Sequence, residues 1–249
     1  MDKKTILVYD SGIGGLNVLL KLKKLSPEFE YLYMSDKKNA PYGKKSEKEL
    51  FELAYTNISR AKKCYDFSVC VLACNTLSTR VIDNLKLHFS DLVFYGVYPF
   101  VQTSLFGSTL LVGTRATINS VYIMKAKREQ KLLQTLDLSD LVLEIENNLP
   151  NLSKIDLQKY FLSVRKDFNF LLLGCTHFCF LKEEFSKIFP HSTIFSEVLG
   201  MSVHDKGFLS TFCPSETKSL KMSLKSFIFE DKMRNFAVYN FLLKKLDKH

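Results

Sequence analysis

The chain has 249 residues, enough for one large domain or two modest ones, and its 46% hydrophobic and 24% charged residues are ordinary for a globular protein. No apolar run approaches the roughly 18 residues that span a bilayer, so we expect no membrane-spanning segment. The formal net charge of +9 would suit a nucleic-acid partner. However, the lysines are scattered through helix-like segments without interleaved aromatic residues, so a lysine-rich surface is favoured over that partner.

The chain begins Met1-Asp-Lys-Lys-Thr5 and runs at once into a short strand-like segment, without the apolar core or cleavage site of a signal peptide. We therefore expect a cytoplasmic protein, in which structural disulfides are disfavoured. The pairs Cys70/Cys74 and Cys175/Cys179 are both spaced C-x3-C. Zinc sites usually use C-x2-C or C-x4-C and redox proteins C-x2-C, so we expect neither a metal nor a thiol-redox function.

Strand-like and helix-like segments alternate along the first part of the chain. We expect strands over 5–9, 29–34, 68–73 and 92–97, with helices over 14–25, 46–63 and 76–89. Pro27 ends the first helix, and Ser46-Glu-Lys-Glu49 has the spacing of a capping box at the start of the second. Strands that alternate with helices predict a parallel sheet.

The same order then restarts. We expect strands over 108–112, 141–145 and 168–173, a helix after 113–120, and another over 152–164. Two successive sets predict an α/β fold of two similar domains with a cleft between them. We place the first domain at 1–97 plus 205–249, with a last helix over 231–245 packing back on it, and the second at 98–204.

Cys74 and Cys175 lie in matching local settings in the two halves of the chain. Each follows an apolar run and a small residue, Ala73 or Gly174, and each precedes polar residues that open a helix. A helix N-terminus favours the thiolate, the reactive form of cysteine. A lone cysteine at such a place is usually core filler. Two at equivalent sites predict a cleft with one acid/base group on each wall.

Polar residues follow both thiols. Asn75, Thr76 and Thr176 are neutral donors that could hold carboxylate and ammonium groups without quenching a thiolate. His177 lies two residues after the second thiol and could set its protonation state or act as an acid itself. The remaining histidines are interpreted as surface or structural residues.

Two loops carry turn-forming residues after the first and second strands. The glycines of Asp10-Ser-Gly-Ile-Gly-Gly15 let backbone N–H groups approach an anion, and the spacing matches neither the dinucleotide fingerprint nor the P-loop. A plain turn capped by Asp10 is an equal alternative. In Asn39-Ala-Pro-Tyr-Gly43, Tyr42 adds a hydroxyl and a lid-like ring, although taken alone this motif favours an ordinary loop.

Together these motifs resemble the cofactor-independent glutamate racemases of the aspartate/glutamate racemase superfamily. The matches, in the family's order, are Asp10-Ser-Gly-Ile-Gly-Gly15, Pro41-Tyr-Gly43, Ala73-Cys-Asn-Thr76, Gly113-Thr-Arg-Ala-Thr117 with Ser120 and Tyr122, and Leu173-Gly-Cys-Thr-His177. The resemblance implies two pseudosymmetric α/β domains, each a mainly parallel sheet flanked by helices, with the active site in the interdomain cleft and no cofactor.

The resemblance also implies roles for individual residues. Cys74 and Cys175 would be the catalytic acid/bases, supported by Asp10 and His177. Glu146, with Glu144 as the alternative, would be a further supporting carboxylate. The amino acid would be bound by Ser11, Pro41, Tyr42, Gly43, Asn75, Thr76, Thr117 and Thr176.

Two departures from the family pattern lie beside these residues. After His177 the chain reads Phe178-Cys-Phe180, so Cys179 replaces the usual proline, and Phe195-Ser196 replaces an acidic Asp-Ser pair. They bear on second-domain packing and on the level of activity more than on the chemistry.

The function implied by the resemblance is glutamate racemisation that supplies D-glutamate for peptidoglycan synthesis, in cell-wall biogenesis and cell shape. Family members are often dimers, so a homodimer is one possibility. The N-terminal extension of members activated by a cell-wall precursor is lacking, so we expect no such activation. Aspartate or another amino acid is the alternative substrate. A catalytically silent binding or regulatory protein, for example one that interacts with DNA gyrase, is the alternative of another class.

Overall fold

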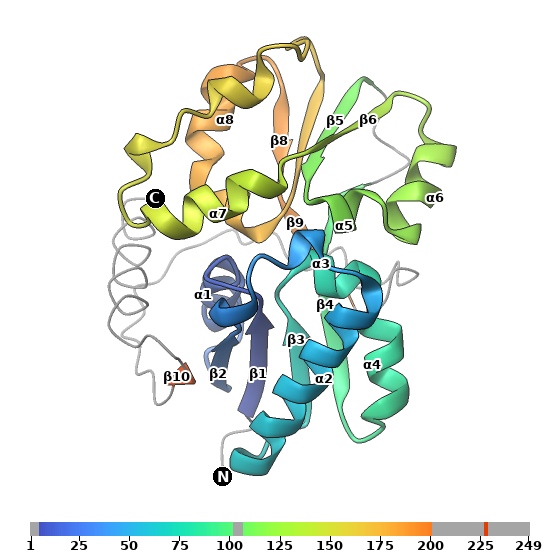
Figure 1. Ribbon diagram of the computed structural model, residues 1–249, viewed down its shortest axis with the longest axis vertical. Helices are drawn as coiled ribbons and strands as arrows, with labels where there is room; N and C mark the ends of the chain where they lie inside the picture. The colour runs from blue at the N-terminus through green and yellow to red at the C-terminus, as the bar shows by residue number, and fades with distance from the viewer. Residues whose placement is uncertain (1–4, 102–106, 201–226, 229–249) are drawn as a thin grey trace.

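The computed structural model describes residues 5–101, 107–200 and 227–228, with 197–200 and 227–228 described by their backbone alone. It has two stacked lobes, each built on its own sheet (Figure 1). Among the described residues, we find no helix that combines the length and the apolar character needed to cross a membrane.

The first lobe is built on a sheet with the order β10-β2-β1-β3-β4-β9. Strands β1 (Thr5–Asp10), β2 (Glu30–Ser35), β3 (Val69–Leu72), β4 (Val93–Pro99) and β10 (Phe227–Ile228) run parallel, and β9 (Glu197–Gly200) pairs antiparallel with β4. The helices are α1 (Leu16–Leu25), α2 (Glu47–Cys64), α3 (Asn75–Arg80) and α4 (Ile82–His88), with 3-10 turns η1 (Lys37–Asn39) and η2 (Tyr42–Lys44).

The alternating faces of β1 show why this strand is apolar throughout. Ile6 and Val8 belong to the same buried cluster as α1, whereas Leu7 and Tyr9 belong to the cluster of α2 and α4. A parallel strand covered on both faces needs apolar residues at every position. The predicted capping box at Ser46 is present and begins α2.

The second lobe is built on a four-stranded parallel sheet with the order β6-β5-β7-β8. Its strands are β5 (Thr109–Gly113), β6 (Leu133–Asp137), β7 (Phe170–Gly174) and β8 (Thr193–Phe195). The helices are α5 (Arg115–Ile118), α6 (Val121–Glu129), α7 (Ser139–Asn148) and α8 (Lys182–Ile188), with 3-10 turns η3 (Leu152–Lys154), η4 (Gln158–Phe161) and η5 (Thr176–Leu181). The α/β architecture predicted from the sequence is confirmed.

The strand predicted over 141–145 is wrong, because this segment lies within helix α7. Its buried residues Val142, Ile145 and Glu146 recur at helical spacing, i, i+3 and i+4. The strand of this region is β6, over Leu133–Asp137, which was not predicted. The helix expected over 152–164 is instead the pair of 3-10 turns η3 and η4, and the helix expected over 76–89 is divided into α3 and α4.

The predicted division into domains differs from the sheets at two places. Strand β4 of the first sheet extends to Pro99, whereas the division ended the first domain at residue 97. Strand β9 adds to the first sheet, whereas the division assigned residues 197–200 to the second domain. The helix expected over 231–245 lies outside the described residues, so the division as a whole stays a prediction.

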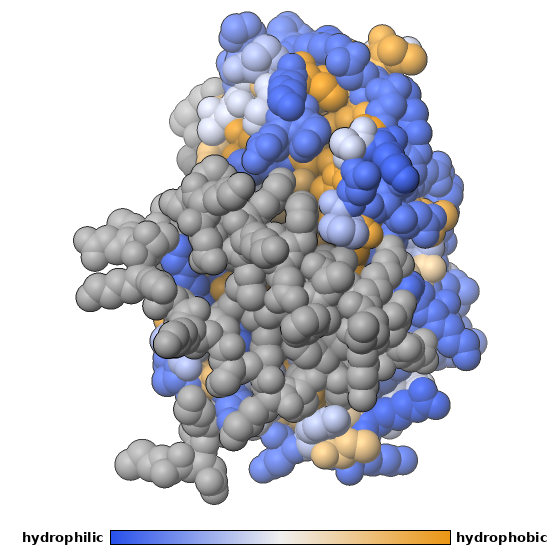
Figure 2. Space-filling view, turned by 90° about the vertical axis from the view of Figure 1, so that its left-hand side faces the viewer, coloured by the Kyte–Doolittle hydropathy of each residue, from blue (hydrophilic) through white to orange (hydrophobic). Residues whose placement is uncertain are grey.

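On the side of the molecule shown in Figure 2, the upper, second lobe carries apolar side chains among mostly hydrophilic ones.

Candidate active site

The carboxyl ends of the central strands of both sheets meet between the lobes (Figure 1). Asp10 ends β1 and Cys74 follows β3, whereas Thr114 follows β5 and Cys175 follows β7. Ligands of open α/β sheets bind outside the carboxyl ends of the strands. The two thiols predicted from the sequence are therefore presented from opposite lobes to one interface.

Cys74 is the residue directly before α3 and is only 6% exposed. Its Sγ lies 3.6 Å from the hydroxyl of Ser11. Burial raises the pKa of Cys74 to about 12, and the negative charge of Asp10 adds to this effect, whereas hydrogen bonding with the Leu77 N–H and with Ser11 opposes it. In this conformation Cys74 is therefore a protonated thiol at neutral pH, a group that can give up a proton only to a strong base.

Cys175 precedes η5 and is 7% exposed. Its Sγ lies 3.8 Å from Nδ1 of His177, and Nε2 of His177 lies 2.7 Å from Oε1 of Glu146. Burial by itself would lower the pKa of His177, but the hydrogen bonds and charges of Cys175 and Glu146 outweigh burial and raise it well above its usual value. A protonated imidazole donates to Glu146 through one nitrogen and faces the sulfur with the other.

Each lobe also donates a hydrogen bond to the buried carboxylate of the other. The backbone N–H of Ile13, in the first lobe, donates to Oε1 of Glu146 at 2.8 Å. The hydroxyl of Thr176, in the second lobe, donates to Oδ2 of Asp10 at 3.3 Å. Burial raises the pKa of Asp10 to about 6, opposed by the nearby charge of His177 and by the hydrogen bond from the Gly12 N–H. The supporting groups of the two thiols are thus coupled across the interface.

The glycines of the Asp10–Gly15 loop permit this close approach. A Cβ on Gly12 would lie 2.0 Å from Oε1 of Glu146, and a Cβ on Gly14 would lie 2.4 Å from Oγ1 of Thr176. The sequence predicted that this loop could approach an anion, and the anion it meets in the structure is the Glu146 carboxylate. The loop is therefore the contact between the two sets of acid/base residues.

A group of hydroxyls lies beside the first thiol. Oγ1 of Thr76 lies 2.9 Å from Oγ1 of Thr114 and 3.3 Å from that of Thr117, and the latter two are 3.0 Å apart. All three side chains are buried. Nearby, the buried Oδ1 of Asn75 has no hydrogen-bond partner within the described part of the chain. These groups can offer donors and acceptors to a polar ligand.

The Pro41-Tyr-Gly43 loop contacts this group from the side of the first lobe. A Cβ on Gly43 would lie 2.5 Å from Cβ of Thr114, so only glycine lets the loop pack this closely. The ring of Tyr42 is 1% exposed, and its hydroxyl donates to Asp36 at 2.5 Å. Tyr42 is thus a buried anchor of the loop, and the expectation of a lid-like ring is wrong.

The structure brings most of the predicted residues to this interface, and it separates the two glutamate candidates. Glu146 contacts His177, whereas Glu144 forms an ion pair with Lys159 at the surface. Thr114 was not predicted as a site residue, although it lies in a motif that carried the family resemblance. Its position beside Thr76 depends on the packing of one lobe on the other, which no local pattern signals.

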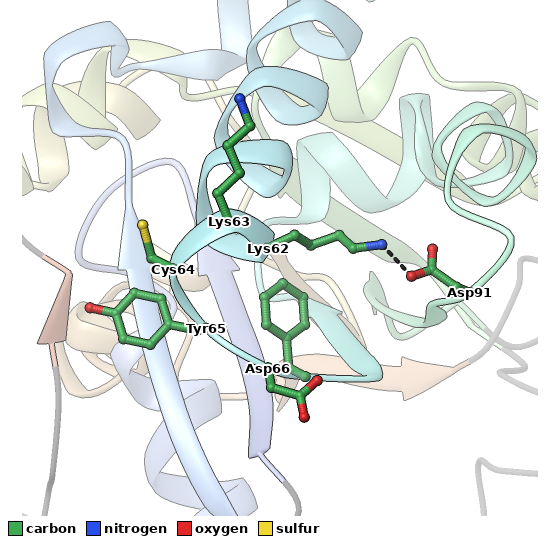
Figure 3. Close-up of a pocket in the computed structure, with 7 residues that line it drawn as sticks. Lys62, Lys63, Cys64, Tyr65, Asp66 and Asp91 are labelled. Carbon is green, nitrogen blue, oxygen red and sulfur yellow. Dashed lines mark hydrogen bonds and ion pairs between the residues drawn. The ribbon is translucent and has the colours of Figure 1, made fainter.

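A surface hollow elsewhere is a weaker candidate for the site. It lies at the carboxyl end of α2 and is crossed by the Lys62–Asp91 ion pair; its lining is Lys62, Lys63, Cys64, Tyr65, Asp66, Phe67 and Asp91 (Figure 3). The lining segment 62–67 leads into the start of β3. The hollow therefore lies at the amino ends of the strands, whereas the thiols lie at their carboxyl ends. Because ligands favour the carboxyl edge, the site is assigned to the thiols.

Comparisons with known proteins point to one family. A glutamate racemase of Buchnera aphidicola subsp. Schizaphis graminum is 39% identical over 201 residues, which are 74% of this chain and 76% of that protein. One of Serratia proteamaculans is 33% identical over 206 residues, 77% of this chain and 70% of that protein. No protein-family model matches the chain.

Solved structures agree in fold. The crystal structure of Escherichia coli glutamate racemase in complex with L-glutamate and the activator UDP-MurNAc-Ala superposes with a TM-score of 0.69 at 28% identity, covering 78% of each chain. Glutamate racemase from Thermus thermophilus in complex with β-chloro-D-alanine superposes with a TM-score of 0.60 at 27% identity, covering 78% of this chain and 75% of that one.

Proposed function

The chain belongs to the glutamate racemase family, and we propose that it interconverts L- and D-glutamate with Cys74 and Cys175 as the two acid/base groups. The observation that carries this proposal is the presentation of one buried thiol from each lobe to a single interface, each with its own supporting carboxylate nearby. Inversion at a carbon needs a proton removed from one face and returned on the other.

In the proposed reaction, one cysteine as thiolate takes the α-proton of glutamate and becomes a thiol. The other thiol gives its proton to the opposite face of the same carbon and becomes a thiolate. The proton count balances, and the reverse reaction exchanges the two roles. Proton transfer by positioned groups accelerates a reaction by only about 10²–10⁴-fold. Preorganised hydrogen bonds around the carboxylates of the substrate must therefore supply much of the remaining rate acceleration.

The electrostatics of the two half-sites differ. Cys74 is held as a thiol by burial and by the charge of Asp10. Cys175 faces a His177 whose pKa is raised well above its usual value, and a neighbouring cation is the setting in which reactive thiolates occur. We infer that the two half-sites are not equivalent in the empty enzyme, with Cys74 as its proton donor.

Glutamate would be held by the groups beside the thiols. Ser11, Thr76, Thr117 and Thr176 offer hydroxyls, and Asn75 offers its buried Oδ1 to the ammonium group. Because the hydroxyl of Tyr42 donates to Asp36, the 41–43 loop would bind through its backbone. The chemical class of each contact suits an amino acid with a second carboxylate, and aspartate is the competing substrate.

Circular dichroism of L-glutamate with purified protein and no added cofactor tests this proposal. The expected result is loss of ellipticity with the wild type and none with Cys74→Ser or Cys175→Ser. Near-normal turnover in either variant would refute the two-base assignment. Activity on L-aspartate alone would keep the mechanism and change the substrate. Salt-sensitive DNA binding by a protein silent on both amino acids would favour the regulatory alternative.

We further propose that the D-glutamate produced supplies peptidoglycan synthesis, a role that follows from the family resemblance. The cytoplasmic location and the homodimer stay predictions. The homodimer rests on the family resemblance alone. Sedimentation at micromolar concentration decides this point: a dimer supports the prediction and a monomer contradicts it.

A further inference from the structure

A buried polar network lies behind the first thiol and is not used by the proposed chemistry. Oδ2 of Asp36 accepts from the hydroxyl of Tyr42 at 2.5 Å and from Nδ2 of Asn57 at 3.0 Å. The hydroxyl of Tyr9 lies 2.8 Å from that of Tyr42 and 3.0 Å from Nδ2 of Asn57. Nδ2 of Asn39 also lies within 3.0 Å of both carboxylate oxygens. These residues come from β1, the end of β2, η1, η2 and α2.

The carboxylate fixes the direction of every hydrogen bond in this network. An ionised Asp36 only accepts, so the single proton of Tyr42 points to it. The Tyr42 oxygen can then only accept from Tyr9, whose own oxygen accepts from Asn57. The resulting order is Asn57 to Tyr9 to Tyr42 to Asp36. A polar network in which each donor has an assigned acceptor specifies one arrangement of its members.

The arrangement that it specifies is that of the Pro41-Tyr-Gly43 loop. Tyr42 is the side chain of the loop that enters the network, so the network sets the position of Gly43. Gly43 packs on Thr114, where an added Cβ would lie 2.5 Å away. Thr114 in turn contacts Thr76, which follows the first thiol by two residues. The network is thereby connected, through Gly43, to Thr76 of the first lobe and Thr114 of the second, and it does not itself contact the reacting atoms.

We propose that Asp36, together with Tyr9 and Asn57, is a positioning group that holds the 41–43 loop in its glutamate-binding position. This proposal rests on the proposed function. Loss of the network would weaken binding of the substrate and of the transition state alike. Such uniform loss raises KM and leaves kcat nearly unchanged. Substitution of a residue that merely stabilised the fold would lower the melting temperature without raising KM selectively.

The test compares Asp36→Asn and the milder Tyr9→Phe with the matched control Tyr31→Phe. The Tyr31 hydroxyl is also buried and also donates within the first lobe, to Leu22 O at 3.0 Å and Ser26 O at 2.9 Å, and neither of these bonds involves the 41–43 loop. We expect KM for L-glutamate to rise roughly tenfold in Asp36→Asn and about threefold in Tyr9→Phe, with kcat within about twofold. Tyr31→Phe should lower thermal stability and leave KM unchanged.

The outcomes separate this proposal from the proposed function. If Asp36→Asn does not fold, Tyr9→Phe decides. An active wild type with an unchanged KM in Tyr9→Phe, or with an equal rise of KM in Tyr31→Phe, overturns the positioning role and leaves the racemase intact. A wild type that is silent on glutamate overturns both.

Discussion

Replacing Glu146 with glutamine tests the supporting carboxylate of the second thiol. Oε1 of Glu146 accepts from the Ile13 N–H at 2.8 Å and from Nε2 of His177 at 2.7 Å. Glutamine keeps an oxygen for these bonds but removes the negative charge. The substitution therefore leaves the geometry in place and removes one of the two attractions, the other being that of Cys175, that raise the pKa of His177.

The magnitude follows from the difference between a charge-assisted hydrogen bond, about 1.5–3 kcal/mol, and a neutral one, about 0.5–1.5 kcal/mol. The loss of about 1–2 kcal/mol corresponds to a fall of roughly 5- to 30-fold in kcat/KM. The two enantiomers have equal free energies, so kcat/KM must fall equally in both directions. The assay is polarimetry started from pure L- and from pure D-glutamate.

The matched control is Glu144→Gln, two residues earlier on the same helix. Glu144 pairs with Lys159 at the surface, and such pairs contribute about 0–1 kcal/mol to stability. We expect kcat/KM of this control to stay within about twofold of the wild type. If Glu146→Gln also stayed within twofold, or if both variants lost activity equally, the account of the His177–Glu146 pair would be refuted.

Two further predictions concern the Asp10–Gly15 loop. Gly12→Ala puts a Cβ 2.0 Å from Oε1 of Glu146, so kcat/KM should fall at least about tenfold by polarimetry, whereas Gly113→Ala, with its nearest contact at 3.1 Å, should lose at most about threefold. Equal losses would contradict the steric argument. Because the pKa of Asp10 is raised from 3.8 to about 6, its contribution to folding stability is present below pH 3.8 and lost as the pH rises through about 6. Between pH 4 and 7 the free energy of unfolding of Asp10→Asn should therefore rise by about 2 kcal/mol relative to that of the wild type, and a parallel pH dependence of the two proteins in denaturant unfolding would contradict the raised pKa.

The sequence predicted the thiols and the loops that follow the strands because those patterns are local. It could not separate Glu144 from Glu146, for a physical reason. Read as a strand, the 141–145 segment and its continuation place these two residues on one face, since strand side chains repeat every second residue. Read as the helix that the structure contains, Glu146 joins the buried face of Val142 and Ile145, and Glu144 leaves it.

The contacts between the lobes could not be predicted from the sequence, for a different reason. The hydrogen bond from Ile13 to Glu146 joins residues 133 positions apart, and that between Thr176 and Asp10 joins residues 166 apart. No periodicity or spacing encodes such a pairing. The glycines at 12 and 14 signalled a close backbone approach, but only the packed lobes show that the approaching groups are the acid/base residues themselves.

The most direct test of the central claim is racemisation of L-glutamate in deuterium oxide, stopped at low conversion, with mass analysis of each separated enantiomer. Two thiols on opposite faces predict that the D-glutamate formed carries solvent deuterium at Cα, while the remaining L-glutamate keeps its protium. Product that retains the original α-proton would show that one group both removes and returns it, and this would contradict the assignment of Cys74 and Cys175 to the two faces.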